Sequence, residues 1–233
     1  MFLMKGMLEP TLASDYAKTR DVERIRLTVS LLLRTNAVIL AAGFAILLGC
    51  GSQVIDLATN GRYGTEVLLA LWIVVQFFAI TIAETLWISL NPIGRIAFHN
   101  TLWTWFSFVG YALLAIAVYR HDPILLVAMS AVPYLAVYLW LRFISREASL
   151  QGGFAVPRLL RLLVPIAASA LAAQGVLHSG LPSGHLQTLL ALFVAGGGFA
   201  VVLRFIGLFQ RTEIDAVQAI SPKLAKLLRL MSS

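Results

Sequence analysis

Three polar side chains, Arg34, Gln76 and Glu84, lie inside otherwise apolar stretches of the sequence. An ionisable group at the centre of a bilayer costs about 2.5–3.5 kcal/mol, so it is typical of a transport pathway, a proton relay or a buried pair. The carboxylate of Glu84 can exchange a proton or a sodium ion, or it can pair with Arg34. The amide of Gln76 can line a cavity or join two helices. These three residues are therefore candidates for substrate binding or ion coupling.

Arg34 also allows a second interpretation. It lies about two turns into the apolar stretch over residues 28–50. Long cationic side chains near a helix end extend to the lipid headgroups, because the apolar part of the side chain stays in the hydrocarbon while the charge reaches water. A membrane anchor and a binding residue are both compatible with this position.

The sequence contains no grouping typical of an enzyme or a metal site. The single cysteine, Cys50, excludes an intramolecular disulfide, and no Cys/His cluster has metal-ligand spacing. The aspartates between the first and last apolar stretches, Asp56 and Asp122, fall in separate connections. We therefore expect no catalytic residue, no metal and no cofactor. A membrane-embedded enzyme acting on a lipid or polyprenyl substrate stays as the alternative from another class.

The elements that must position these residues follow from the composition. Of the 233 residues, 59% are hydrophobic and only 12% are charged, against about 25% charged residues in soluble domains. The net charge is +7, but the basic residues stand in short segments between apolar runs. That placement favours anionic lipid surfaces over nucleic acid as the partner.

Six apolar stretches are each long enough to cross the bilayer, since about 20 helical residues span its hydrocarbon core. They cover residues 28–50, 66–90, 101–119, 123–143, 159–178 and 185–208. Backbone groups in lipid must be hydrogen-bonded within the segment, which makes each stretch a helix. The sequence predicts an all-α integral membrane bundle of about six transmembrane helices.

Lysine and arginine fall mainly on one side of this arrangement. The side with both termini and the even-numbered connections holds Lys5, Lys18, Arg20, Arg24, Arg26, Arg95, Arg142, Arg146, Arg158, Arg161, Arg211, Lys223, Lys226 and Arg229. The alternate connections hold only Arg62 and Arg120. By the positive-inside rule, both termini are expected to be cytoplasmic.

The ends of the chain are amphipathic. We expect residues 1–27 to be a cytoplasmic lead-in, with a short helix over 11–27 that runs into the first span, followed by the bundle over 28–208. Residues 209–233 are expected to form a basic cytoplasmic tail on the inner leaflet.

Four passages, taken in this order, resemble the C-terminal half of bacterial polysaccharide exporters, the oligosaccharide flippases of the multidrug/oligosaccharidyl-lipid/polysaccharide superfamily. The segment 9–26 is similar to the family's cytoplasmic loop, with a proline, a Ser-x-x-Tyr/Ala stretch and a charged helix. Residues 54–63 stand where the family has an external loop, and residues 91–100 resemble its short cytoplasmic turn. Residues 158–165, followed by two spans and a basic tail, are similar to its last helix pair.

The resemblance implies a function in the bacterial cytoplasmic membrane: translocation of a lipid-linked oligosaccharide, the precursor of a polysaccharide, driven by a proton or sodium gradient. It implies that Arg34 reaches the diphosphate of the lipid carrier. Family members have twelve to fourteen spans, so six spans correspond to the last six. We therefore expect a partial or split transporter with a partner chain that supplies the N-terminal lobe, or else a membrane fragment without transport activity.

Overall fold

The computed structural model describes residues 2–146, 159–180, 184–206 and 208. Within these ranges the chain forms helices and contains no strand. The helices are α1 (Phe2–Thr19), α2 (Val22–Thr59), α3 (Val67–Leu90), α4 (Ile96–Tyr119), α5 (Pro123–Leu139), the π-helical turn η1 (Trp140–Ile144), α7 (Leu163–Leu177) and α8 (His185–Ile206). The basic tail predicted over 209–233 lies outside the described residues.

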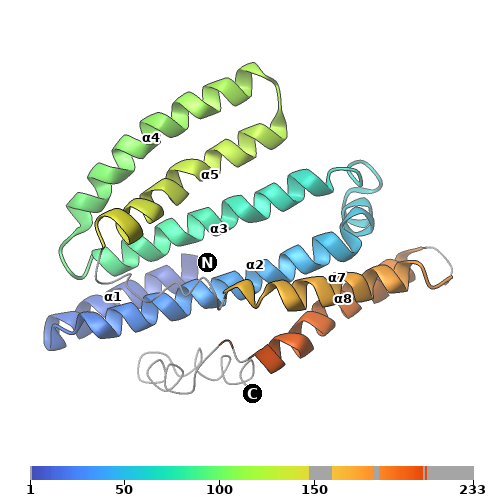
Figure 1. Ribbon diagram of the computed structural model, residues 1–233, viewed down its shortest axis with the longest axis horizontal. Helices are drawn as coiled ribbons and strands as arrows, with labels where there is room; N and C mark the ends of the chain where they lie inside the picture. Colours follow the sequence, from blue (N-terminus) through green and yellow to red (C-terminus); the bar gives the residue numbers. More distant parts are fainter. Residues whose placement is uncertain (1, 147–158, 181–183, 207, 209–233) are drawn as a thin grey trace.

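The long helices lie side by side, as Figure 1 shows. α4 packs on α5, α5 on α3, and α3 on α2, which also contacts α7 and α8. α2 is therefore the helix that joins the group formed by α3, α4 and α5 to the α7–α8 hairpin.

Among the described residues, five helices are long and apolar enough to cross a membrane: α2, α3, α4, α5 together with η1, and α8. α7 is apolar but has only 15 residues. The prediction of an all-helical, multi-pass membrane bundle is confirmed, with the fifth of the six expected spans shorter than the sequence predicted.

Many large apolar side chains lie on the outer surface of the bundle. Its interior contains small residues, such as Ala79 and Ala173, together with larger ones, such as Ile82 and Leu86, all at most 2% exposed. The large apolar side chains that face outward include Phe77, Trp105, Phe108, Leu171, Leu186, Phe193 and Phe205. Water would penalise so much exposed apolar surface, whereas hydrocarbon does not, so this distribution is that of a membrane protein.

α2 is longer than the apolar stretch that predicted it. It has 38 residues, against about 20 needed to cross the hydrocarbon core. The apolar stretch ends at Cys50, where the backbone leaves helical geometry with φ −148° and ψ 27°, and the helix then continues to Thr59. Asn60 in the left-handed conformation and Gly61 with φ 80° end it. The turn expected from residue 51 onward therefore begins nine residues later.

Pro165 accounts for the shortness of α7. Proline cannot donate to the carbonyl four residues earlier and its ring clashes there, so a continuous helix through residue 161 is blocked. The chain has a turn at residues 161–162, and the regular helix starts at Leu163. The other spans match their apolar stretches closely at both ends, except that α4 begins at Ile96 instead of residue 101.

The N-terminal lead-in is a separate helix. α1 ends at Thr19, Arg20 takes a positive φ of 54°, and the carboxylate of Asp21 caps α2 by accepting the Glu23 N–H at 2.9 Å. The expectation of one helix running into the first span was wrong, because this turn and cap divide the segment. The side chain of Leu12 in α1 is only 1% exposed, so α1 packs against the bundle through this residue.

An ion pair between Asp15 and Arg24 joins α1 to α2, and we expect it to contribute little stability. The Asp15 carboxylate accepts from the Arg24 guanidinium at 2.8 Å and 3.0 Å, but the two side chains are 28% and 42% exposed. Asp15→Asn should lower the free energy of unfolding by less than about 1 kcal/mol, since solvent screens such pairs. Unfolding of the purified protein in mixed detergent micelles measures this. A larger loss would mean that the pair, and not Leu12, holds α1 in place.

Candidate intramembrane site

Gln76 and Glu84 lie on the same face of α3. They are eight positions apart, about 12 Å along a helix axis at 1.5 Å per residue. Both line cavities whose other walls come from α4 and α5, and Arg34, a residue of α2, lines neither of them. Two of the three candidates are thus brought into one region of the bundle.

Glu84 lines a cavity of about 230 Å³, which we call the Glu84 cavity. Its walls are built by Ile80, Ala83, Glu84, Trp87, His99, Asn100, Trp103 and Tyr134. α3 supplies the carboxylate, the first turns of α4 supply the imidazole and an amide, and α5 supplies the phenol. The cavity therefore combines hydrogen-bonding groups with aromatic rings inside membrane-spanning helices.

Gln76 lines a second cavity of about 150 Å³, the Gln76 cavity. Its other walls are Trp103, Ser107, Gly110, Tyr111, Leu114, Ser130, Pro133 and Tyr134. Trp103 and Tyr134 belong to both cavities, and their rings contact each other with centroids 4.7 Å apart. The two cavities follow one another along α3 and share this aromatic pair, and we call them together the track.

Gly110 allows α4 to approach α5 closely at this track. A Cβ atom on Gly110 would stand 2.9 Å from Cγ of Pro133, closer than side chains pack. The glycine is therefore needed for the helix contact that encloses the Gln76 cavity.

Arg34 lies away from the track. It is 4% exposed, and its guanidinium donates to the Ser30 hydroxyl at 2.5 Å, to the Ser30 carbonyl at 3.3 Å and to the Leu208 carbonyl at 3.3 Å. It therefore ties α2 to the chain beyond α8, and the structure does not pair it with Glu84. A side chain that extends to the lipid headgroups would keep its charged end exposed, whereas the side chain of Arg34 is buried inside the protein.

His99 is the residue that the sequence analysis missed. We expected the helix to begin at residue 101, which placed His99 in a turn, but it lies in the first turn of α4 and is 4% exposed. A signal was present: His99, Trp103 and Ser107 are spaced four apart and so share a helix face. All three line the track.

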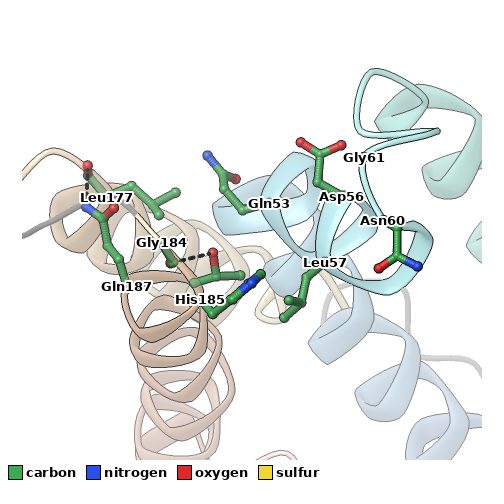
Figure 2. A pocket seen from close by; sticks show the side chains of 10 residues that line it. Gln53, Asp56, Leu57, Asn60, Gly61, Leu177, Gly184, His185 and Gln187 are labelled. Carbon is green, nitrogen blue, oxygen red and sulfur yellow. Dashed lines mark hydrogen bonds between the residues drawn. The ribbon is translucent and has the colours of Figure 1, made fainter.

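A third, larger hollow lies at the other end of the bundle. This cleft of about 620 Å³ is bounded by the end of α2 and the α7–α8 hairpin, as Figure 2 shows. Asp56 and His185 are exposed there, and the Gln187 amide is used to hold the hairpin, donating to the carbonyls of Val176 and Leu177 at 3.2 Å and 2.9 Å. Its polar groups stand at helix ends, unlike those of the track within the spans.

Comparisons of the chain with protein-family models, with curated proteins and with solved structures found no match. The flippase resemblance therefore rests on the residues and motifs from which it was inferred.

Proposed function

We propose that this chain is part of a translocator that moves a lipid-linked oligosaccharide, a polysaccharide precursor, across the bacterial cytoplasmic membrane. In this proposal both termini are cytoplasmic, and a partner chain supplies the N-terminal lobe. The observation that carries the proposal is the track along α3, whose mainly apolar walls carry the polar side chains of Glu84, Gln76 and His99 beside the Trp103–Tyr134 pair.

The track suits a carbohydrate more than a purely apolar substrate. Hydroxyl groups of a sugar need hydrogen-bond partners when they leave water, and Gln76, Ser107 and Ser130 offer them. Aromatic rings such as those of Trp103 and Tyr134 pack against the apolar face of a sugar ring. Because the helices around the track face lipid, the apolar lipid carrier would stay in the bilayer while the oligosaccharide crosses along the track.

Glu84 is the group through which an ion gradient would act. An ionised carboxylate within a span has a high free energy, and binding of a cation lowers it by neutralising the charge. Because Glu84 and the sugar-contacting rings share one cavity, ion binding and substrate binding would change the same walls.

The test is transfer of the lipid-linked oligosaccharide in inverted membrane vesicles from cells that produce the chain, since such vesicles also contain any partner lobe. Glu84→Gln should lower the flux at least 10-fold, because it removes about 1.4 kcal/mol or more of the coupling free energy. Glu66→Gln is the matched control: it makes the same change at the exposed start of α3 and should leave the flux unchanged.

Equal flux in Glu84→Gln and Glu66→Gln would contradict the proposal. The same vesicles also discriminate the enzyme alternative, for which a carboxylate and an imidazole in one cavity are suitable groups. Extraction of the lipid after the assay should return it chemically intact. A cleaved or transferred lipid that depends on Glu84 would identify an enzyme instead.

A further inference from the structure

His99 is buried with its hydrogen-bonding capacity unused. Its backbone N–H donates to the Arg95 carbonyl at 3.2 Å as part of α4, but neither ring nitrogen meets a hydrogen-bond partner in the described part of the chain. The side chain of Asn100 lies close enough to interact with the ring without reaching hydrogen-bond geometry. An unsatisfied buried polar group destabilises the folded protein, so an imidazole kept in this state calls for an explanation.

The groups around His99 come from three helices. Trp87 of α3 meets the imidazole edge to face, with ring centroids 5.9 Å apart and planes at 88°. Glu84 of α3 and Tyr134 of α5 line the same cavity. Arg95 and Arg142, the basic residues nearest in the chain at the ends of α4 and α5, are not among the described residues that line it. Glu84 is thus the charged residue that lines this cavity together with the imidazole, among the residues that the structure describes.

Within this set of groups, the imidazole favours a proton over sodium. Hard cations take oxygen ligands, and an imidazole nitrogen is a poor one for them. Imidazole and carboxylate both bind protons, however, and their charges compensate in one protonation state. With Glu84 ionised and His99 neutral the cavity carries one negative charge, and uptake of one proton makes it neutral, either as an imidazolium–carboxylate pair or as a carboxylic acid beside a neutral imidazole.

We propose that His99 and Glu84 form an intramembrane proton-binding site, and that proton uptake there drives the transport step. The second half of this statement rests on the proposed function, while proton binding itself does not. The aromatic pair Trp103 and Tyr134 links the proton site to the Gln76 cavity, so the change of charge occurs beside the groups proposed to hold the sugar.

Trp87 provides a direct readout, because a protonated imidazole in ring contact quenches tryptophan fluorescence more than a neutral one. The purified full chain in nanodiscs is titrated between about pH 5 and pH 9, around the ordinary histidine range. We expect a sigmoidal quenching component that is lost in His99→Gln and in Trp87→Phe. His178→Gln, at the exposed end of α7, is the matched control and should retain the whole component.

Glu84→Gln tests whether the carboxylate belongs to the site. An opposite charge within about 4–6 Å changes the midpoint of a titration by about 1 pH unit or more, so the midpoint should move by that amount in this variant if Glu84 and His99 form the proposed pair. An unchanged midpoint would overturn the pair. Quenching that persists in His99→Gln would overturn the site, and a midpoint that moves when sodium replaces choline at constant ionic strength would assign the site to a metal cation.

These outcomes are independent of transport. If His99→Gln does not fold, Trp87→Phe and Glu84→Gln still decide the question. A normal titration together with an unaffected flux in Glu84→Gln would refute the proposed function and leave the proton site. Loss of flux in Glu84→Gln without a pH-dependent quenching component would support the proposed function and refute the proton site.

Discussion

Gly49→Leu should destabilise the bundle by about 3 kcal/mol, because Gly49 lies in a close contact between α2 and α7. A Cβ atom at this position would stand 2.9 Å from Cβ of Ala173 and 3.2 Å from Cα of Ala170. Neither neighbour can rotate away, since one is a methyl group and the other is backbone. The helices must separate instead, which is the cost of overpacking at the upper end of its usual range.

Gly43→Leu is the control for this change on the same helix. A Cβ atom there meets nothing within 4 Å, so the leucine has room, and the free energy of unfolding should stay within about 1 kcal/mol of the original. Both variants are measured by unfolding in mixed detergent micelles. Equal stability of the two would contradict the close α2–α7 contact.

Two substitutions of Arg34, one that removes the charge and one that keeps it, should distinguish a structural role from a role in substrate binding. Arg34→Met removes the buried charge and leaves the Leu208 carbonyl without this donor, a loss of about 1–3 kcal/mol. Arg34→Lys keeps the charge but loses the planar fork that reaches both Ser30 and Leu208. We expect lysine to destabilise the protein more than methionine, because an ammonium with fewer hydrogen bonds stays buried.

A role in binding the lipid diphosphate implied by the family resemblance predicts a different result, which is seen in transport. In that case lysine, which also binds phosphate, would preserve transport while methionine would abolish it. Unfolding and vesicle flux of the same two variants give both readouts. The contacts of Arg34 with Ser30 and Leu208 favour the structural order.

The positions of most spans could be predicted because lipid allows an apolar stretch few alternatives to a helix. α3, α8 and the α5–η1 segment were found nearly to the residue. Hydropathy measures contact with lipid, however, and not helix formation. The polar continuation of α2 from Gly51 to Thr59 is helical all the same, and so it was taken for a connection.

The candidate site was predictable along one helix but not across helices. The spacing of Gln76 and Glu84 places them on one face of α3. Which helix meets that face depends on contacts distant in sequence, and the sequence allowed α2 and Arg34 as readily as α4 and α5. His99 was missed for a local reason, because Gly94 and Arg95 resemble the continuation of a turn although α4 starts directly after them.

The kink in α2 gives this protein a built-in chemical reporter. Cys50, at the kink, is the single cysteine of the chain and is 1% exposed, packed beside Ala173 and Ala191 of the α7–α8 hairpin. A maleimide alkylates only a thiol that it can reach, so the alkylation rate measures how often this part of α2 separates from the hairpin. Interhelix opening can therefore be timed in the native sequence, with substrate or a pH gradient present, without adding or removing a cysteine.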